Sequence, residues 1–187
     1  DVYNVAVGHN AGLGITTGIQ NTLIGSLAGD AFTDADKNTA VGTNALSSDT
    51  LGSKSVAVGT AALFTQNFTT ATDSYNTAVG FEAGKATTTG INNTLIGGLA
   101  GDALTDADYN TAIGYAALSG DTLGSRSTAL GYGTLINQNF TTATNTYNTA
   151  VGYYAGVSVT TGAENTIIGG QAGDTVTTGS GNVIIGY

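Results

Sequence analysis

Residues 38–42 read Asn-Thr-Ala-Val-Gly, and close variants of this pentapeptide recur along the whole chain. The glycines that close them are Gly8, Gly25, Gly42, Gly59, Gly80, Gly97, Gly114, Gly131, Gly152, Gly169 and Gly186. Successive glycines lie 17, 17, 17 and 21 residues apart, and this set repeats, which superimposes a 72-residue period on the shorter one. A fixed short period indicates stacked, nearly identical units. We therefore interpret residues 1–187 as a single repeat domain and as a piece of a longer fibre.

Three positions around each closing glycine are restricted in residue type. The residue before it is always Val, Ile or Leu, which is typical of a pleated, half-buried backbone. Three residues after it stands Ala, replaced once by Thr134, which indicates a narrow interior. The residue four before it is Asn or Ser, and we expect a structural ladder of Asn21, Asn38, Asn76, Asn93, Asn110, Asn148, Asn165 and Asn182.

The length of the repeat limits the shape of each coil. At about 3.3 Å per residue, such a coil encloses no more than one thin layer of side chains. Thr-Thr-Gly at 16–18, 88–90, 160–162 and 177–179 marks a second corner, so we expect at least two short strands per coil. The Gly- and Thr-rich composition and the lack of a 3.6-residue period exclude helices. The sequence predicts an all-β parallel β-solenoid, or β-roll, of about eleven coils of 17 to 21 residues.

The longer coils and some apolar pairs extend this prediction. The extra residues at 67–75 and 139–147 should bulge outward into water. Two adjacent pentapeptide residues are large and apolar at 23–24, 95–96, 167–168 and 184–185, although neighbours on a strand point to opposite faces. A thin solenoid covers its second face only with another chain, which predicts a lateral homotrimer. The alternative is that these side chains are exposed or covered by a loop of their own coil.

The pentapeptide resembles repeats of two kinds of surface protein. Ser55-Val56-Ala57-Val58-Gly59 is similar to the motif of trimeric autotransporter adhesin heads, which are left-handed parallel β-rolls. Residues 38–46 and 110–118 resemble more closely the 17-residue repeat of phage and bacterial tail-fibre-like proteins. This resemblance covers essentially every coil. It implies a left-handed, trimeric roll and says little about a binding target.

Composition excludes several classes of function. The chain has no Cys, which removes disulfides, thiolate metal sites and cysteine nucleophiles. Four basic residues against 13 acidic ones make nucleic acid and anionic membranes poor partners. No apolar run is long enough to insert into a membrane. His9 is the only histidine and has no nearby partner in the sequence, so we expect no catalytic site and no enzyme.

One acidic motif favours a cation. Asp34 and Asp36 recur 72 residues later as Asp106 and Asp108, and Asp-x-Asp-x-Asn resembles the start of a calcium loop. These four residues are candidate Ca²⁺ ligands, and no other cofactor is expected. The alternative is that they are solvated carboxylates at a corner.

Two kinds of surface row suggest contacts. Thr22, which shares its position with seven other Thr residues, alternates with Val there, and we interpret that row as facing inward rather than as an ice-binding array. Phe81, Tyr115, Tyr132 and Tyr153 each follow a closing glycine, and their rings should stack along the fibre and contact a neighbouring chain or a cell-surface glycan.

Together these patterns predict an extracellular structural fibre or filament. Its setting would be a phage tail fibre on a virion or an adhesin on a bacterial cell surface. The repeats would supply reach, stiffness and repetitive surface binding, with lateral trimers continuing end to end. The alternative is an ice-binding or calcium-dependent carbohydrate-binding solenoid.

Overall fold

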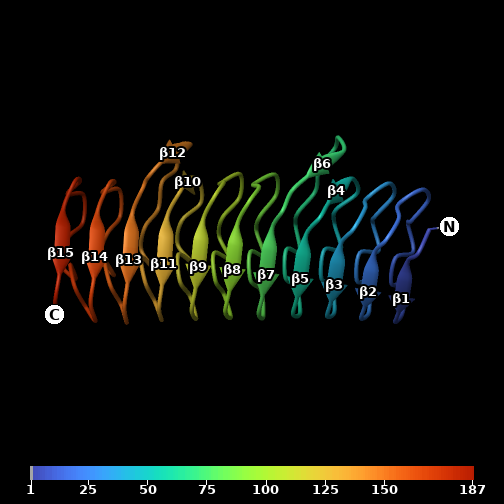
Figure 1. Ribbon diagram of the computed structural model, residues 1–187, viewed down its shortest axis with the longest axis horizontal. Coiled ribbons are helices and arrows are strands. Elements are labelled where there is room, and N and C mark those ends of the chain that lie inside the picture. The colour runs from blue at the N-terminus through green and yellow to red at the C-terminus, as the bar shows by residue number, and fades with distance from the viewer. Residues whose placement is uncertain (1) are drawn as a thin grey trace.

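Every Thr-Ala-Val-type tripeptide forms a three-residue strand in the computed structural model, which describes residues 2–187. These strands are β1 (Val5–Val7), β2 (Thr22–Ile24), β3 (Thr39–Val41), β5 (Val56–Val58), β7 (Thr77–Val79), β8 (Thr94–Ile96), β9 (Thr111–Ile113), β11 (Thr128–Leu130), β13 (Thr149–Val151), β14 (Thr166–Ile168) and β15 (Val183–Ile185). They form one 11-stranded sheet in chain order, and all pairs are parallel and one coil apart. Figure 1 shows the coils as a single row from one end of the chain to the other. The predicted parallel β-solenoid of about eleven coils is confirmed.

The expectation of two strands in every coil is wrong. Among residues 2–187 a second strand occurs only beside the long coils, where β4 (Gly52–Ser53) pairs with β6 (Thr72–Asp73) and β10 (Gly124–Ser125) with β12 (Thr144–Asn145). The rest of each coil is a chain of turns that still hydrogen-bond to the next coil, as Gly29 N–H does to the Ala45 carbonyl at 2.9 Å. In these turns, the second and fourth residues after the closing glycine have a left-handed backbone conformation. This interrupts the extended conformation that a strand needs.

The corners depend on positive φ angles at four positions of a coil. The closing glycines have φ between 131° and 143°, and a Cβ at Gly97 would clash with the Gly114 carbonyl of the next coil. The other three positions are mostly occupied by non-glycine residues, such as Leu46 and Leu63 at φ 52° and 50°. Gly18 of a Thr-Thr-Gly corner has no positive φ and is required because the Ala35 carbonyl lies against it.

The interior is thin and alternates in composition along the fibre. The Ala row is buried from Ala28 to Ala172, as expected for a narrow core. Large inward residues of one coil lie against glycines, as Leu23 and Phe32 do around Gly29, where a Cβ would lie only 2.7–2.9 Å from their carbons. The coils that contain Leu46 or Leu63 instead place a polar side chain, Asp49 or Gln66, in the core.

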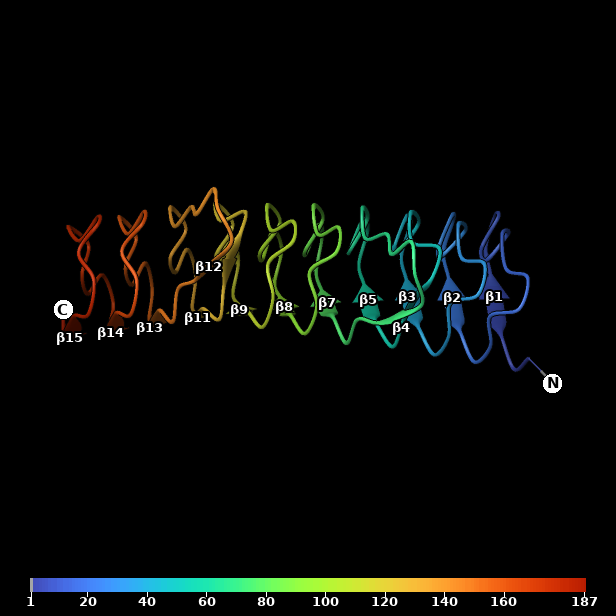
Figure 2. The ribbon, with the colours of Figure 1, turned by 90° about the horizontal axis from the view of Figure 1, so that it is seen from above.

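The long coils project from the row, as predicted. In Figure 1 the segments that carry β6 and β12 leave the line of the other coils, and Figure 2 shows the same row of coils from above. Phe68 and Phe140 anchor their bases in buried positions, whereas residues 69–71 and 141–143 are exposed. The part of the chain that the structure describes contains no helix, and therefore none long and apolar enough to cross a membrane.

Candidate functional surfaces

The outer sheet face, formed by the first and third residues of the eleven strands, is an uncharged surface. From β2 to β14 the middle residue of each strand is fully buried, while its two neighbours are half-buried or exposed. One column of this face is Thr with three Val, and the other is Val, Ile and Leu. Parallel sheets are normally covered on both faces, but no part of residues 2–187 covers this one.

This arrangement corrects the prediction for the Thr row. Thr22, Thr39 and their equivalents point outward, so the inward interpretation is wrong. In the apolar pairs the first residue is inward and the second is exposed, at 40% for Ile24, 37% for Ile96, 39% for Ile168 and 72% for Ile185. No loop of the same coil covers these side chains. The trimer itself stays a prediction.

The asparagine ladder runs through the core side of the corner. Asn93 illustrates it, because its Nδ2 donates to the Ala107 carbonyl at 2.7 Å and its Oδ1 accepts from the Asn110 N–H at 2.9 Å. The same pair of bonds connects Asn21 and Asn38 and the later asparagines. Each asparagine therefore connects neighbouring coils and provides a hydrogen-bond partner for a backbone carbonyl at the turn.

The four predicted calcium ligands lie at the corner beside this ladder and bond to the preceding coil. Asp34 Oδ1 accepts from the Thr17 hydroxyl at 2.5 Å, and Asp36 Oδ1 accepts from the Ile19 N–H at 2.8 Å. Asp106 and Asp108 make the same contacts with Thr89 and Ile91. Burial raises the pKa of Asp108. Within residues 2–187 no group of three or more His, Asp or Glu side chains could hold a metal ion, and calcium stays a prediction.

The predicted aromatic row includes a stack of three tyrosine rings. Tyr115 and Tyr132 stack with centroids 5.4 Å apart, and Tyr132 and Tyr153 stack at 5.6 Å. Tyr154 lies edge-on to two of these rings, and its hydrogen bond to Tyr132 raises its pKa. Gly98 separates Phe81 from this stack. Because stacked rings cover each other's faces, mainly ring edges and hydroxyls remain for a glycan or a neighbouring chain.

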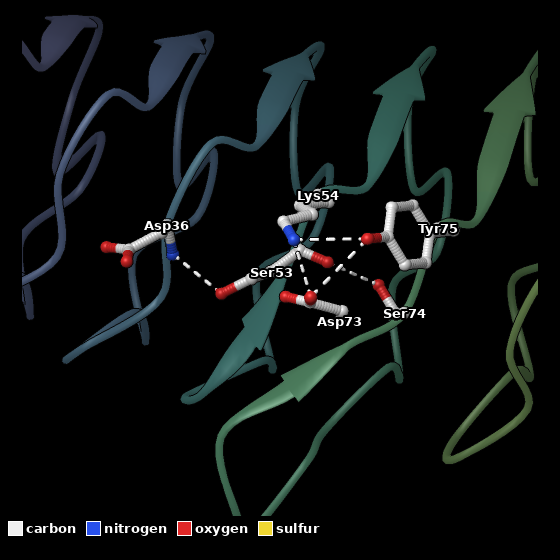
Figure 3. Close-up of polar contacts among 6 residues, drawn as sticks. All are labelled: Asp36, Ser53, Lys54, Asp73, Ser74 and Tyr75. Atoms are coloured by element: carbon white, nitrogen blue, oxygen red, sulfur yellow. Dashed lines mark hydrogen bonds and ion pairs between the residues drawn. The ribbon is translucent and has the colours of Figure 1, made fainter.

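A second edge carries three of the four basic residues and changes between the two long coils. In the first, Lys54 Nζ contacts Asp73 Oδ2 at 2.5 Å and the Tyr75 hydroxyl at 3.1 Å, while Ser53 bonds to Asp36 N–H and the Ser74 hydroxyl (Figure 3). The hydrogen bond between Lys54 and Asp73 raises the pKa of Lys54 and lowers the pKa of Asp73.

The equivalent cluster in the second long coil has lost the ion pair. Arg126 donates from Nε to Asn145 Oδ1 at 3.0 Å, and its guanidinium lies 4.8 Å from the Tyr109 ring centre and 5.9 Å from that of Tyr147. Both clusters are exposed, so they add little stability and act mainly as surface features.

Sequence reasoning missed a buried polar cluster beneath each long coil. In the first, Asp49 accepts from Gln66 Nε2 at 2.6 Å and from the Gly52 N–H at 3.0 Å. Gln66 also donates to Ser55 Oγ at 3.2 Å and accepts from Asn76 Nδ2 at 2.9 Å. Gln66 thus bridges the gap that Ser55 leaves in the asparagine ladder. The available signal was that Ser interrupts the ladder in the same coils that carry Gln at the core position, at 55 and 127.

Comparison of the chain with protein-family models, with curated proteins and with solved structures gives no match.

Proposed function

We propose that this chain is a segment of an extracellular structural fibre or filament, of the phage tail-fibre or bacterial surface-adhesin type, that assembles laterally as a trimer. The outer sheet face carries this proposal. Eleven parallel strands present Thr, Val, Ile and Leu there without a single charge, although the chain has a net charge of −9. Contiguous uncharged faces of this length are typical of interfaces between chains.

The remaining surfaces support a structural function. The asparagine ladder, the stacked corners and the tyrosine stack all connect one coil to the next, which stiffens the row along its axis. The tyrosines and the two projecting coils recur along the chain, so any weak contact they make with a surface would be multiplied.

Assembly is tested by sedimentation and electron microscopy of the intact chain. We expect trimers whose length matches eleven coils, about 50 Å. The double substitution Ile96→Lys and Ile168→Lys places two charges on the outer sheet face and should dissociate the trimer, because a buried unpaired charge is costly.

The control carries the same added charge elsewhere. Thr69→Lys and Thr141→Lys lie on the tips of the projecting coils, 72 residues apart like the first pair, and should leave the trimer intact. A wild-type chain that stays monomeric at high concentration would contradict lateral assembly.

The outward Thr column favours one second candidate, an ice-binding solenoid. Its members repeat every coil at about 4.8 Å, beside an apolar column about 6.6 Å away, which is a regular flat lattice. A monomeric wild-type chain that inhibits ice growth, and loses this activity on Thr94→Lys and Thr111→Lys, would replace the fibre proposal.

A further inference from the structure

In each of the two buried polar clusters, the side-chain amide of a glutamine contacts both a serine hydroxyl and a carboxylate. We propose that they are sites of spontaneous ester cross-linking, in which the Ser55 hydroxyl attacks the side-chain carbonyl carbon of Gln66, and Ser127 attacks Gln138, each releasing ammonia. This inference concerns the interior of the coil and does not depend on the proposed function.

The amide nitrogen of Gln66 is held between the other two groups. It donates one hydrogen bond to Asp49 Oδ2 at 2.6 Å and the other to Ser55 Oγ at 3.2 Å. The leaving nitrogen therefore touches the group that can give it a proton. Because Oγ accepts from this nitrogen, it lies beside the amide, and attack requires a turn of the amide about the Cγ–Cδ bond so that the carbon faces Oγ.

The carbonyl of Gln66 is polarised in the direction that the attack needs. Its Oε1 accepts a hydrogen bond from Asn76 Nδ2 at 2.9 Å in the resting arrangement, which draws electron density away from the amide carbon. The Ser55 hydroxyl is oriented by Ser74 Oγ at 2.5 Å, and Ser74 in turn donates to the Ser53 carbonyl.

Burial favours the cross-link over hydrolysis. Asp49, Ser55, Gln66 and Ser74 are all 0% exposed, so bulk water does not reach the amide or the ester. Once the amide has turned so that its carbon faces Oγ, the reacting groups behave as an intramolecular pair, for which effective molarities of about 10⁵–10⁸ M are attainable. The Asp49 carboxylate accepts hydrogen bonds from the Gly52 and Phe68 N–H groups and from Gln66, which hold it beside the leaving nitrogen.

The reaction balances without any added reagent. The Ser55 Oγ–H bond and the Gln66 Cδ–Nε2 bond break, and a Cδ–Oγ bond forms. The hydroxyl proton passes from Oγ to the amide nitrogen that contacts it, and the nitrogen leaves as neutral ammonia. The product is an ester with no change in net charge.

The second cluster repeats the arrangement with closer contacts. Gln138 Nε2 donates to Asp121 Oδ2 at 2.5 Å and to Ser127 Oγ at 2.9 Å, and Asn148 Nδ2 donates to Gln138 Oε1 at 2.7 Å. Thr146 replaces Ser74 and keeps the hydroxyl contact at 2.5 Å. No other described coil combines an inward Gln with a Ser in the ladder position. The pairing is therefore specific to these coils, and we expect Ser127 to react first.

Intact mass spectrometry of the purified, folded chain tests the proposal. We expect a mass below that of the sequence by one ammonia per cross-link, reaching two after prolonged incubation. Proteolytic peptides should then link Ser55 to Gln66 and Ser127 to Gln138. The readout does not require the variants to fold, because the wild-type mass alone decides.

Variants assign the two losses. Ser55→Ala and Ser127→Ala should each restore one ammonia, whereas Ser53→Ala, a neighbouring hydroxyl that touches neither glutamine, should restore none. A folded wild-type chain that keeps the full sequence mass after days of incubation would overturn the inference. So would an ammonia loss that the Ser55→Ala and Ser127→Ala variants retain.

Discussion

At the scale of single residues, the closing glycines are the most constrained positions. Gly97 combines φ of 133° with a Cβ position blocked by the Gly114 carbonyl. Gly97→Ala should therefore cost more than about 2 kcal/mol of unfolding free energy, because backbone strain and displacement of a neighbouring coil add. Urea melts measure this loss.

The control for this prediction is Gly170, which directly follows the closing glycine of another coil. Gly170 has no positive φ, and nothing lies within 4 Å of the position of its Cβ. Gly170→Ala should stay within about 0.5 kcal/mol of wild type. Equal losses at Gly97 and Gly170 would show that the coils do not approach each other as described.

Asp102 predicts a pH dependence at the residue scale. Its Oδ1 is buried without a hydrogen-bond partner, and burial raises the pKa of its carboxyl. The folded state thus binds the proton more tightly than the unfolded state, so the charge destabilises the fold above the raised pKa and ceases to do so as pH falls through it. Asp102→Asn should raise the melting temperature at neutral pH and have little effect in acid.

Asp174 provides the matched control for Asp102. It occupies the equivalent position, five residues after a closing glycine, but is exposed. Asp174→Asn should leave the melting temperature unchanged at both pH values. A gain on Asp102→Asn that persists unchanged in acid would show that charge burial is not its cause.

At the scale of elements, the asparagine ladder should contribute more to the free energy of unfolding than the short strands beside it. Asn93→Ala leaves the buried Asn110 N–H and Ala107 carbonyl without partners, and each buried unsatisfied group costs about 1–3 kcal/mol. We expect a loss of about 2–4 kcal/mol in a urea melt. Asn182 is only partly buried, and Asn182→Ala should cost less than about 1 kcal/mol. If Asn93→Ala cost no more stability than Asn182→Ala, the buried hydrogen bonds of the ladder would not be a main source of stability.

Local sequence patterns were sufficient to predict some features of these elements and insufficient for others. The spacing of Gly42 and its equivalents, with a branched residue before each, was sufficient to predict coils, parallel pairing and the narrow interior. The outward direction of Thr22 was not predictable, because a three-residue strand has too little alternation to fix its phase and Val substitutes for Thr on a half-covered face as well as inside.

Two further features depend on neighbouring coils and leave little local trace. Leu46 and Leu63 adopt left-handed conformations because stacking on equivalent corners imposes them, against their own preference. Asp49 and Gln66 were not recognised as partners because they are 17 residues apart and meet only when successive coils are in register. The functions of Phe81 and of the tyrosine stack could not be predicted either, because the repeat predicts where these rings lie but not what they bind.

At the scale of the whole molecule, the 72-residue period should define the unit that is removable without loss. Deletion of residues 80–151 joins Val79 to Gly152, which replaces Gly80 by its equivalent. Leu63 then has a glycine neighbour as before, and Gln66 has Val159, the neighbour that Gln138 has in the intact chain. In a repeat array stability is approximately a sum of unit and interface terms, so the fold should persist with four fewer coils, about 19 Å shorter. Thermal melts and small-angle scattering measure both effects.

A smaller deletion should be more harmful than this larger one. Removal of residues 59–79 keeps the pentapeptide frame but places Thr87 opposite Asp49 in place of Gln66, which strips a buried carboxylate of its main donor. Loss of the hydrogen-bond donor to a buried polar group costs about 1–3 kcal/mol, so this chain should melt below both the wild type and the 72-residue deletion. If the melting temperature instead fell with the number of residues removed, the buried clusters would be incidental to stability, and the long period would only set the spacing of the projecting coils.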